Sequence, residues 1–219
     1  MRYEAYNRVF GTVYLLLVTG VLAVLSCAPF FAVVLFTPIP ETLPALALTA
    51  PLLGPAIAAA STVFGEHGTG ADDHAVARGF VRAWRRHARR AVAVSGAATA
   101  AVVVLVVDAV AAYGTPVGAV AIPALIVLTA LTVSSALVLL TALTVRPDVP
   151  VFRLWPACLV LTVRRPWHVL LSLTGWWSLA AATGFAPALA PALLTGPVLY
   201  LCWAGATATL RSAAAPIAR

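Results

Sequence analysis

Residues 78–113 read RGFVRAWRRHARRAVAVSGAATAAVVVLVVDAVAAY, and this stretch decides the fold of the chain. Its first part is crowded with arginine, and residues 91–113 form an apolar run longer than the roughly 20 residues that cross a bilayer. Basic residues gather on the cytoplasmic side of membrane helices. The stretch therefore predicts a transmembrane helix that begins beside an arginine-rich segment on the cytoplasmic side.

The composition extends this interpretation to the whole chain. Hydrophobic residues make up 62% of the 219 residues and charged residues 10%, whereas charged residues make up about a quarter of an ordinary soluble domain. Backbone groups in hydrocarbon have to pair internally, so membrane spans are helices or closed barrels. The apolar runs here are continuous and do not alternate as barrel strands do. The chain is therefore predicted to be an all-α polytopic membrane helical bundle.

All fourteen basic residues are arginines, and they form four clusters separated by apolar runs. This spacing gives about six transmembrane helices in a single integral membrane domain, residues 1–219. The predicted spans are about 9–36, 43–64, 91–113, 117–145, 167–184 and 187–210. Pro29 is expected to kink the first span or end its regular part. The arginine clusters then all lie on the cytoplasmic side of a bacterial plasma membrane. Both termini are therefore predicted to be cytoplasmic.

Two further helices are expected on the arginine side. One is an amphipathic interfacial helix at about 74–90, and the other is an apolar inner helix at about 152–163 that packs against the bundle or dips into it. Phe80 and Trp84 share one face of the first helix, and six arginines share an arc of about 140° on the opposite face. They are Arg78, Arg82, Arg85, Arg86, Arg89 and Arg90. This pattern is typical of a helix that lies in the plane of anionic headgroups. A partner-docking site is the alternative, because arginine captures carboxylates and phosphates well.

Proline and glycine interrupt two of the predicted spans. Span 43–64 contains Pro44, Pro51 and Pro55, with Gly54 between the last two. Such a helix must be bent or broken, and hydrocarbon tolerates this where neighbouring helices or a cavity satisfy the freed backbone groups. A similar motif occurs in the last span. The candidate functional residues inside the membrane are therefore Gly54, Pro55, Gly196 and Pro197.

Three other side chains inside the spans are candidates. Asp108 is the one acidic residue well inside a predicted span, and ionisable groups in membranes are often functional. Because Asp108 lies off the bilayer centre, we favour a role in the outer headgroup layer or a hydrogen bond to a neighbouring helix. Trp176 and Trp177 lie near the middle of the fifth span; packing is the default interpretation, and a platform for a bound sugar is the alternative.

Several functions are excluded at this point. The net charge of +7 records orientation and attraction to anionic headgroups, and no nucleic-acid module accompanies it. No HExxH motif or nucleophile elbow occurs. The acidic and histidine residues within 66–74 lack the usual spacing of metal ligands. We therefore expect no nucleic-acid binding, no enzyme activity, no cofactor and no metal.

Four landmarks together resemble the YesL-like family of small bacterial integral membrane proteins. They are Gly54-Pro55-Ala56, the aromatic and basic helix at 80–90, Asp148-Val149-Pro150 and Arg164-Arg165-Pro166. The resemblance implies a helical inner-membrane protein, often encoded beside carbohydrate uptake systems. The family has no agreed activity and offers no catalytic residues to carry over.

Two functions remain open. The first is a non-enzymatic accessory or regulatory component associated with carbohydrate uptake, whose partners are anionic lipid headgroups and a sugar transporter permease. The second is a small autonomous solute transporter or channel, with a site near the broken spans 43–64 and 187–210. Broken helices of this kind line the binding sites of many transporters.

Overall fold

The computed structural model describes residues 2–36, 39–67, 76–186 and 189–214. Within these ranges all the regular structure is helical, which confirms the all-α fold class. The helices are α1 (Arg2–Ser26), α2 (Ala28–Phe36), α3 (Ile39–Thr49), the 3-10 turn η1 (Ala50–Leu52), α4 (Leu53–His67), α5 (Val76–Ala112), α6 (Gly118–Val145), α7 (Val151–Arg164), α8 (Pro166–Phe185) and α9 (Leu189–Ala214).

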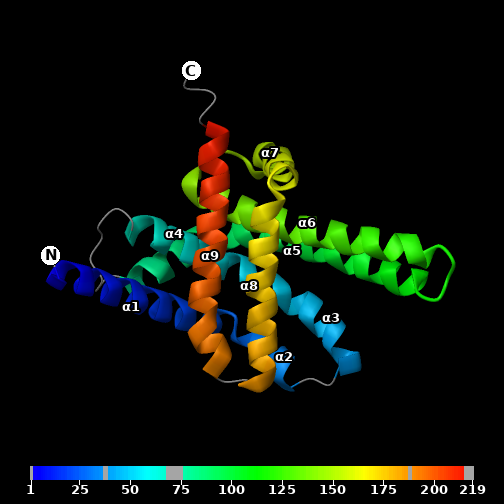
Figure 1. Cartoon of the computed structure of the whole chain (residues 1–219), viewed down its shortest axis with the longest axis horizontal. Helices are drawn as coiled ribbons and strands as arrows, with labels where there is room; N and C mark the ends of the chain where they lie inside the picture. The colour runs from blue at the N-terminus through cyan, green and yellow to red at the C-terminus, as the bar shows by residue number, and fades with distance from the viewer. Residues whose placement is uncertain (1, 37–38, 68–75, 187–188, 215–219) are drawn as a thin grey trace.

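Two long hairpins, α5–α6 and α8–α9, run in clearly different directions (Figure 1). Helix α4 packs along α5, and α1 packs along α9. The start of α5, the end of α6, α7 and the end of α9 lie toward the left and top of Figure 1, whereas the ends of α2, α5 and α8 lie toward the bottom and right. The arginine-bearing ends are thus gathered on one side, and the hairpins diverge on the other.

Four helical segments are long and apolar enough to cross a membrane: Pro44–His67, Val76–Ala112, Gly118–Val145 and Leu189–Leu210. Phe10–Ser26 and Ala28–Phe36 form a fifth candidate, bent by 74°. The chain is therefore a multi-pass membrane protein. The prediction of six spans is not confirmed, because the apolar part of α8, Val169–Phe185, is only about 26 Å long and falls short of the roughly 30 Å hydrocarbon core.

The outer surface of the α5–α6 hairpin suits a lipid environment. Large apolar side chains are exposed along both helices beyond the point where the bundle covers them, including Val104, Val110, Val120 and Ile126. Soluble monomers rarely expose contiguous apolar patches on this scale. Lipid hydrocarbon is the surrounding that matches such a surface.

The bend between α1 and α2 falls at Cys27, two residues before Pro29, where the sequence predicted a kink or an end to the regular helix. Pro29 has no N–H, so it cannot continue the hydrogen-bond ladder of α1. Cys27 is buried at 1% exposure, and its thiol donates to the carbonyl oxygen of Leu52 at 3.5 Å. The bend is thus packed against the segment that links α3 to α4.

Helix α5 corrects one prediction. The sequence analysis separated an interfacial helix at 74–90 from a span at 91–113, but the structure has one unbroken helix of 37 residues from Val76 to Ala112; residues 74 and 75 lie outside the described residues. The helix is about 55 Å long and exceeds the hydrocarbon thickness. Its arginine-rich part therefore continues the span and does not form a separate helix in the headgroup plane. The change in composition at Arg90 is a change of surroundings and not a helix end.

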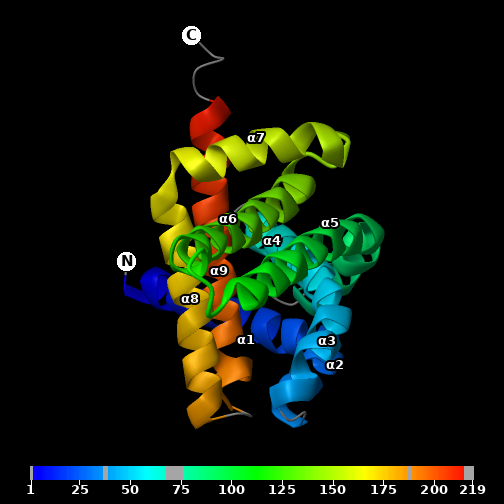
Figure 2. The same cartoon turned by 90° about the vertical axis from the view of Figure 1, so that its right-hand side faces the viewer.

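Helix α7 coincides closely with the inner helix predicted at 152–163, and it lies across the arginine-bearing end of α8 and α9 (Figure 2). Cys158 and Thr162 are buried on its inner face, whereas Phe152 is 71% exposed on its outer face. Further exposed apolar side chains are Trp155, Leu159, Val160 and Val163. A surface helix with one exposed apolar face has the form of a helix that lies in the membrane interface.

Glycine permits the close crossing of α1 and α9. A Cβ atom on Gly196 would overlap the carbonyl oxygen of Leu16, and one on Gly20 would lie 2.8 Å from the backbone nitrogen of Gly196. Small residues at helix contacts in membranes let the two backbones approach. Gly196 is therefore a packing residue of the α1–α9 contact.

We predict that Gly196→Ala destabilises the protein by about 1–3 kcal/mol, because α1 and α9 must move apart to admit the methyl group. Gly96→Ala is the matched control, since a Cβ there meets nothing within 4 Å; its stability should be unchanged or up to about 1 kcal/mol higher through better helix propensity. Unfolding by SDS titration in mixed micelles measures both. Equal effects of the two variants would contradict the close crossing.

Candidate functional site

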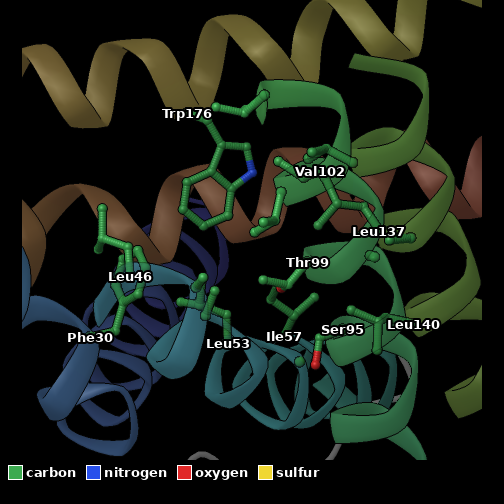
Figure 3. Close-up of a pocket in the computed structure, with 18 of the residues that line it drawn as sticks. Phe30, Leu46, Leu53, Ile57, Ser95, Thr99, Val102, Leu137, Leu140 and Trp176 are labelled. Carbon is green, nitrogen blue, oxygen red and sulfur yellow. The ribbon is translucent and has the colours of Figure 1, made fainter. Parts of the chain in front are cut away.

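A cavity of about 600 Å³ lies where the two hairpins diverge. Its walls come from the α2–α4 segment, from α5 and from α6, and Trp176 of α8 closes one side. Figure 3 shows the Trp176 ring projecting from α8 toward the space that Val102, Leu53 and Phe30 surround. Cavities of 300–1,000 Å³ are typical of small-molecule sites.

One face of α5 forms the longest wall of the cavity. The lining residues of this helix are Ser95, Ala98, Thr99, Val102, Val103, Val106 and Val107. They recur at intervals of three and one, which places them on a single helical face. The cavity therefore follows α5 from Ser95 to Val107, a rise of about 18 Å.

A broken helix forms the opposite wall, and a hydrogen bond from α5 supports the break. Pro55 has no N–H, so it cannot donate to the carbonyl oxygen of Pro51 one turn earlier. The Ser95 hydroxyl contacts that oxygen at 2.7 Å and also lies 2.8 Å from the carbonyl oxygen of Ala91 in its own helix. A side chain of the neighbouring helix thus satisfies the carbonyl that proline frees, as hydrocarbon requires.

Gly54 makes this contact possible. A Cβ atom at Gly54 would overlap the Ser95 hydroxyl oxygen and press against the carbonyl oxygen of Ala91. Gly54 and Pro55 are both buried. We call Pro51, Gly54, Pro55 and Ser95 the Ser95 clasp. It fixes the approach of α4 to α5 at the inner end of the cavity.

The structure separates the two proline and glycine motifs that the sequence analysis treated together. Gly54 lines the cavity, and Pro55 is buried directly behind it. Gly196 is buried at the α1–α9 crossing, Pro197 follows it, and neither lines the cavity. The two motifs support two different helix contacts and do not form one site.

The paired tryptophans are also separated. Trp176 lines the cavity, whereas Trp177 is 79% exposed on another face of α8. Adjacent residues on a helix differ by about 100° in direction. The pair therefore offers no joint platform for a sugar.

Asp108 lies outside the cavity. It is exposed on α5, one residue beyond Val107, which is the last lining residue of that helix. It is close to the α5 end that faces away from the arginines. That Asp108 reaches the outer headgroup layer stays a prediction.

The six arginines at the start of α5 are all exposed, and the opposite face of the helix is buried in the protein. They are Arg78, Arg82, Arg85, Arg86, Arg89 and Arg90. Phe80, Ala83 and His87 are buried at 2%, 5% and 7% exposure, and Trp84 packs partly buried against the core. Phe80 and Trp84 therefore anchor the helix in the bundle and do not extend a docking surface, which corrects their predicted role.

Arg90 has a structural partner as well. Its guanidinium donates to the carbonyl oxygen of Pro147, just after α6. This hydrogen bond ties the arginine-bearing part of α5 to the end of α6. The arginine face is thus held on a fixed support.

The cavity is chemically simple. Among the described residues that line it, none is charged, and the hydroxyl groups come from Ser95 and Thr99. The Ser95 hydroxyl is already engaged in the clasp. In the described ranges no group of three histidine, cysteine or acidic side chains could hold a metal ion. The walls suit a hydrocarbon group much better than a sugar, whose hydroxyls would need hydrogen-bond partners.

Comparisons with protein-family models, with curated proteins and with solved structures found no match. The fold and the site therefore define the class: an all-α, multi-pass membrane protein with an apolar cavity between diverging hairpins and an arginine face at the opposite end of the same long helix.

The sequence analysis missed Ser95 and Thr99. Ser95 lies 44 residues from the carbonyl group that it contacts, so no local spacing connects the two. The available signal was chemical: the three prolines of span 43–64 free carbonyl groups, and a hydroxyl on another span can satisfy one of them.

We predict that Ser95→Ala lowers the free energy of unfolding by about 1 kcal/mol, because the Pro51 carbonyl then loses its hydrogen bond from α5 and keeps only the one from the Leu53 N–H. Ser135→Ala is the matched control. Both serines are 8% exposed, but the Ser135 hydroxyl donates at 2.9 Å to the carbonyl oxygen of Thr132 in its own helix. Unfolding in mixed micelles should show the larger loss for Ser95→Ala, and the reverse order would contradict the clasp.

Proposed function

We propose that this chain is a non-enzymatic accessory or regulatory protein of the bacterial plasma membrane, with both termini in the cytoplasm. Its arginine face binds an acidic cytoplasmic segment of a sugar-uptake permease. The exposed arginine face on a fixed helix supports the docking role. The link to sugar uptake rests on the resemblance to the YesL-like family.

The geometry of the arginine face favours docking to one partner over a general attraction to anionic surfaces. The six arginines extend from one arc of a single helix whose other face is buried, so the backbone positions that carry them are fixed. The planar guanidinium suits bidentate capture of carboxylates, and less side-chain freedom is lost for each hydrogen bond formed than with lysine. Anionic headgroups satisfy the same chemistry, and in this proposal they compete for the face when the permease is absent.

A pull-down from native membranes in a nanodisc-forming polymer tests the proposal. We expect the tagged wild-type chain to recover a permease in stoichiometric amount, with chemical cross-links near residues 80–90. In the variant Arg82→Gln, Arg86→Gln and Arg89→Gln, recovery should fall about tenfold or more, because three exposed ion pairs of up to about 1 kcal/mol each are lost.

The control variant removes the same charge from α7. Arg153, Arg164 and Arg165 are all exposed, so changing these three to glutamine alters the net charge equally but spares α5. Recovery of the permease should then be retained. Recovery of this chain alone from wild-type membranes, or equal losses in both variants, would contradict the docking role.

A second candidate function is autonomous transport, and the cavity beside the broken α3–α4 segment favours it. Because its walls are apolar, such a transporter would carry an apolar solute. Proteoliposomes should then show uptake of a fluorescent fatty acid above that of protein-free liposomes. Ala98→Phe, which fills the cavity, should slow this uptake several-fold. Asp108→Asn should leave it unchanged, since Asp108 lies outside the cavity; no uptake by the wild type would exclude this function.

A further inference from the structure

The two ends of the cavity differ. Near the Ser95 clasp it is closed by buried side chains, including Ile57, Leu137 and Leu140. At the other end the lining residues are exposed: Val107 at 60% and Val103 at 39%. The cavity is therefore blind toward the arginine-bearing ends and open toward the opposite leaflet.

Its length slightly exceeds the depth of one leaflet. From Val107 to Ser95 the cavity follows α5 for about 18 Å, and half of the hydrocarbon core is about 15 Å. Its open end lies about 9 Å from Tyr113, at the far end of the span predicted at 91–113. The head of a chain that reaches the clasp therefore lies at the open end of the cavity, just beyond Val107.

Water is a poor occupant of the cavity, because a buried water needs two to four polar partners and the walls are almost wholly apolar. An empty cavity would forfeit the dispersion contacts of its walls.

We propose that this cavity binds one acyl chain of a phospholipid from the leaflet opposite the arginine-bearing ends. The chain lies along the α5 face from Val107 to Ser95, with the indole of Trp176 against its side and the headgroup outside the cavity, just beyond Val107. The site is independent of the proposed docking role. It holds lipid whether or not a partner is bound.

The experiment uses the full chain in nanodiscs that contain phosphatidylethanolamine with a diazirine midway along one acyl chain. After illumination, mass spectrometry locates the adducts. Adducts should concentrate on the lining residues of α5 and on Trp176, in excess over Ile126, which is exposed to lipid on α6. A second experiment uses a free fatty acid with the same diazirine. It tells whether the occupant of the cavity is a bilayer phospholipid or a free fatty acid.

Ala98→Phe and Ala136→Phe fill the cavity from α5 and from α6, and both alanines line it. Ala100→Phe is the control, because Ala100 is exposed on the other side of α5 and does not line the cavity. Adducts inside the cavity should fall about tenfold in either filling variant and persist in the control. The melting temperatures of all three variants identify any variant that fails to fold. If one filling variant fails to fold, the other filling variant tests the proposal.

Two results would overturn the proposal. In the first, adducts spread evenly over lipid-exposed positions and do not change in the filling variants, which means that the cavity takes up no chain. In the second, only the free fatty acid labels the lining residues, which means that the occupant is not a bilayer phospholipid.

Discussion

The contact between the Ser95 hydroxyl and the Pro51 carbonyl is the interaction on which the architecture depends. Hydrocarbon offers no water to a carbonyl group that has lost its helical donor. Pro55 removes that donor, and the Pro51 carbonyl accepts instead from the Leu53 N–H and, at 2.7 Å, from the Ser95 hydroxyl of another helix. Because Gly54 has no side chain, α4 and α5 approach closely enough for this replacement. The missing helical hydrogen bond at Pro55 thereby fixes the position of α5 relative to α4.

The break in the span has a second consequence, which is the cavity itself. On one side of the clasp α4 packs along α5, whereas on the other side α3 turns onto a different course, toward the lower right of Figure 1, and the α5–α6 hairpin continues without close cover. Membrane helices tilt by up to about 40° from the bilayer normal. Two hairpins that diverge in one membrane must therefore both be tilted, in different directions. The space between the hairpins is therefore a product of the proline-rich segment, and its walls inherit the apolar composition of the spans.

The sequence predicted the features that depend on composition and local pattern. The all-α class, the inner helix now seen as α7 and the arginine arc of α5 all follow from runs and periodicities. Features set by distant contacts were not predictable. The composition change at Arg90 resembles a helix boundary, yet α5 continues because no proline interrupts it and its buried stripe, with Phe80 and His87, continues on one face. Equally, local pattern cannot decide which of Trp176 and Trp177 faces inward.

Helix α5 carries both surfaces of interest, the arginine face at its start and the cavity wall near its end. An acyl chain in the cavity and a partner on the arginine face can influence each other only if α5 has two positions relative to α4 that the two ligands favour unequally. The Ser95 clasp and the hydrogen bond from Arg90 to Pro147 both oppose such a movement. While these contacts hold, α5 acts as a fixed support, and the two surfaces bind their ligands independently.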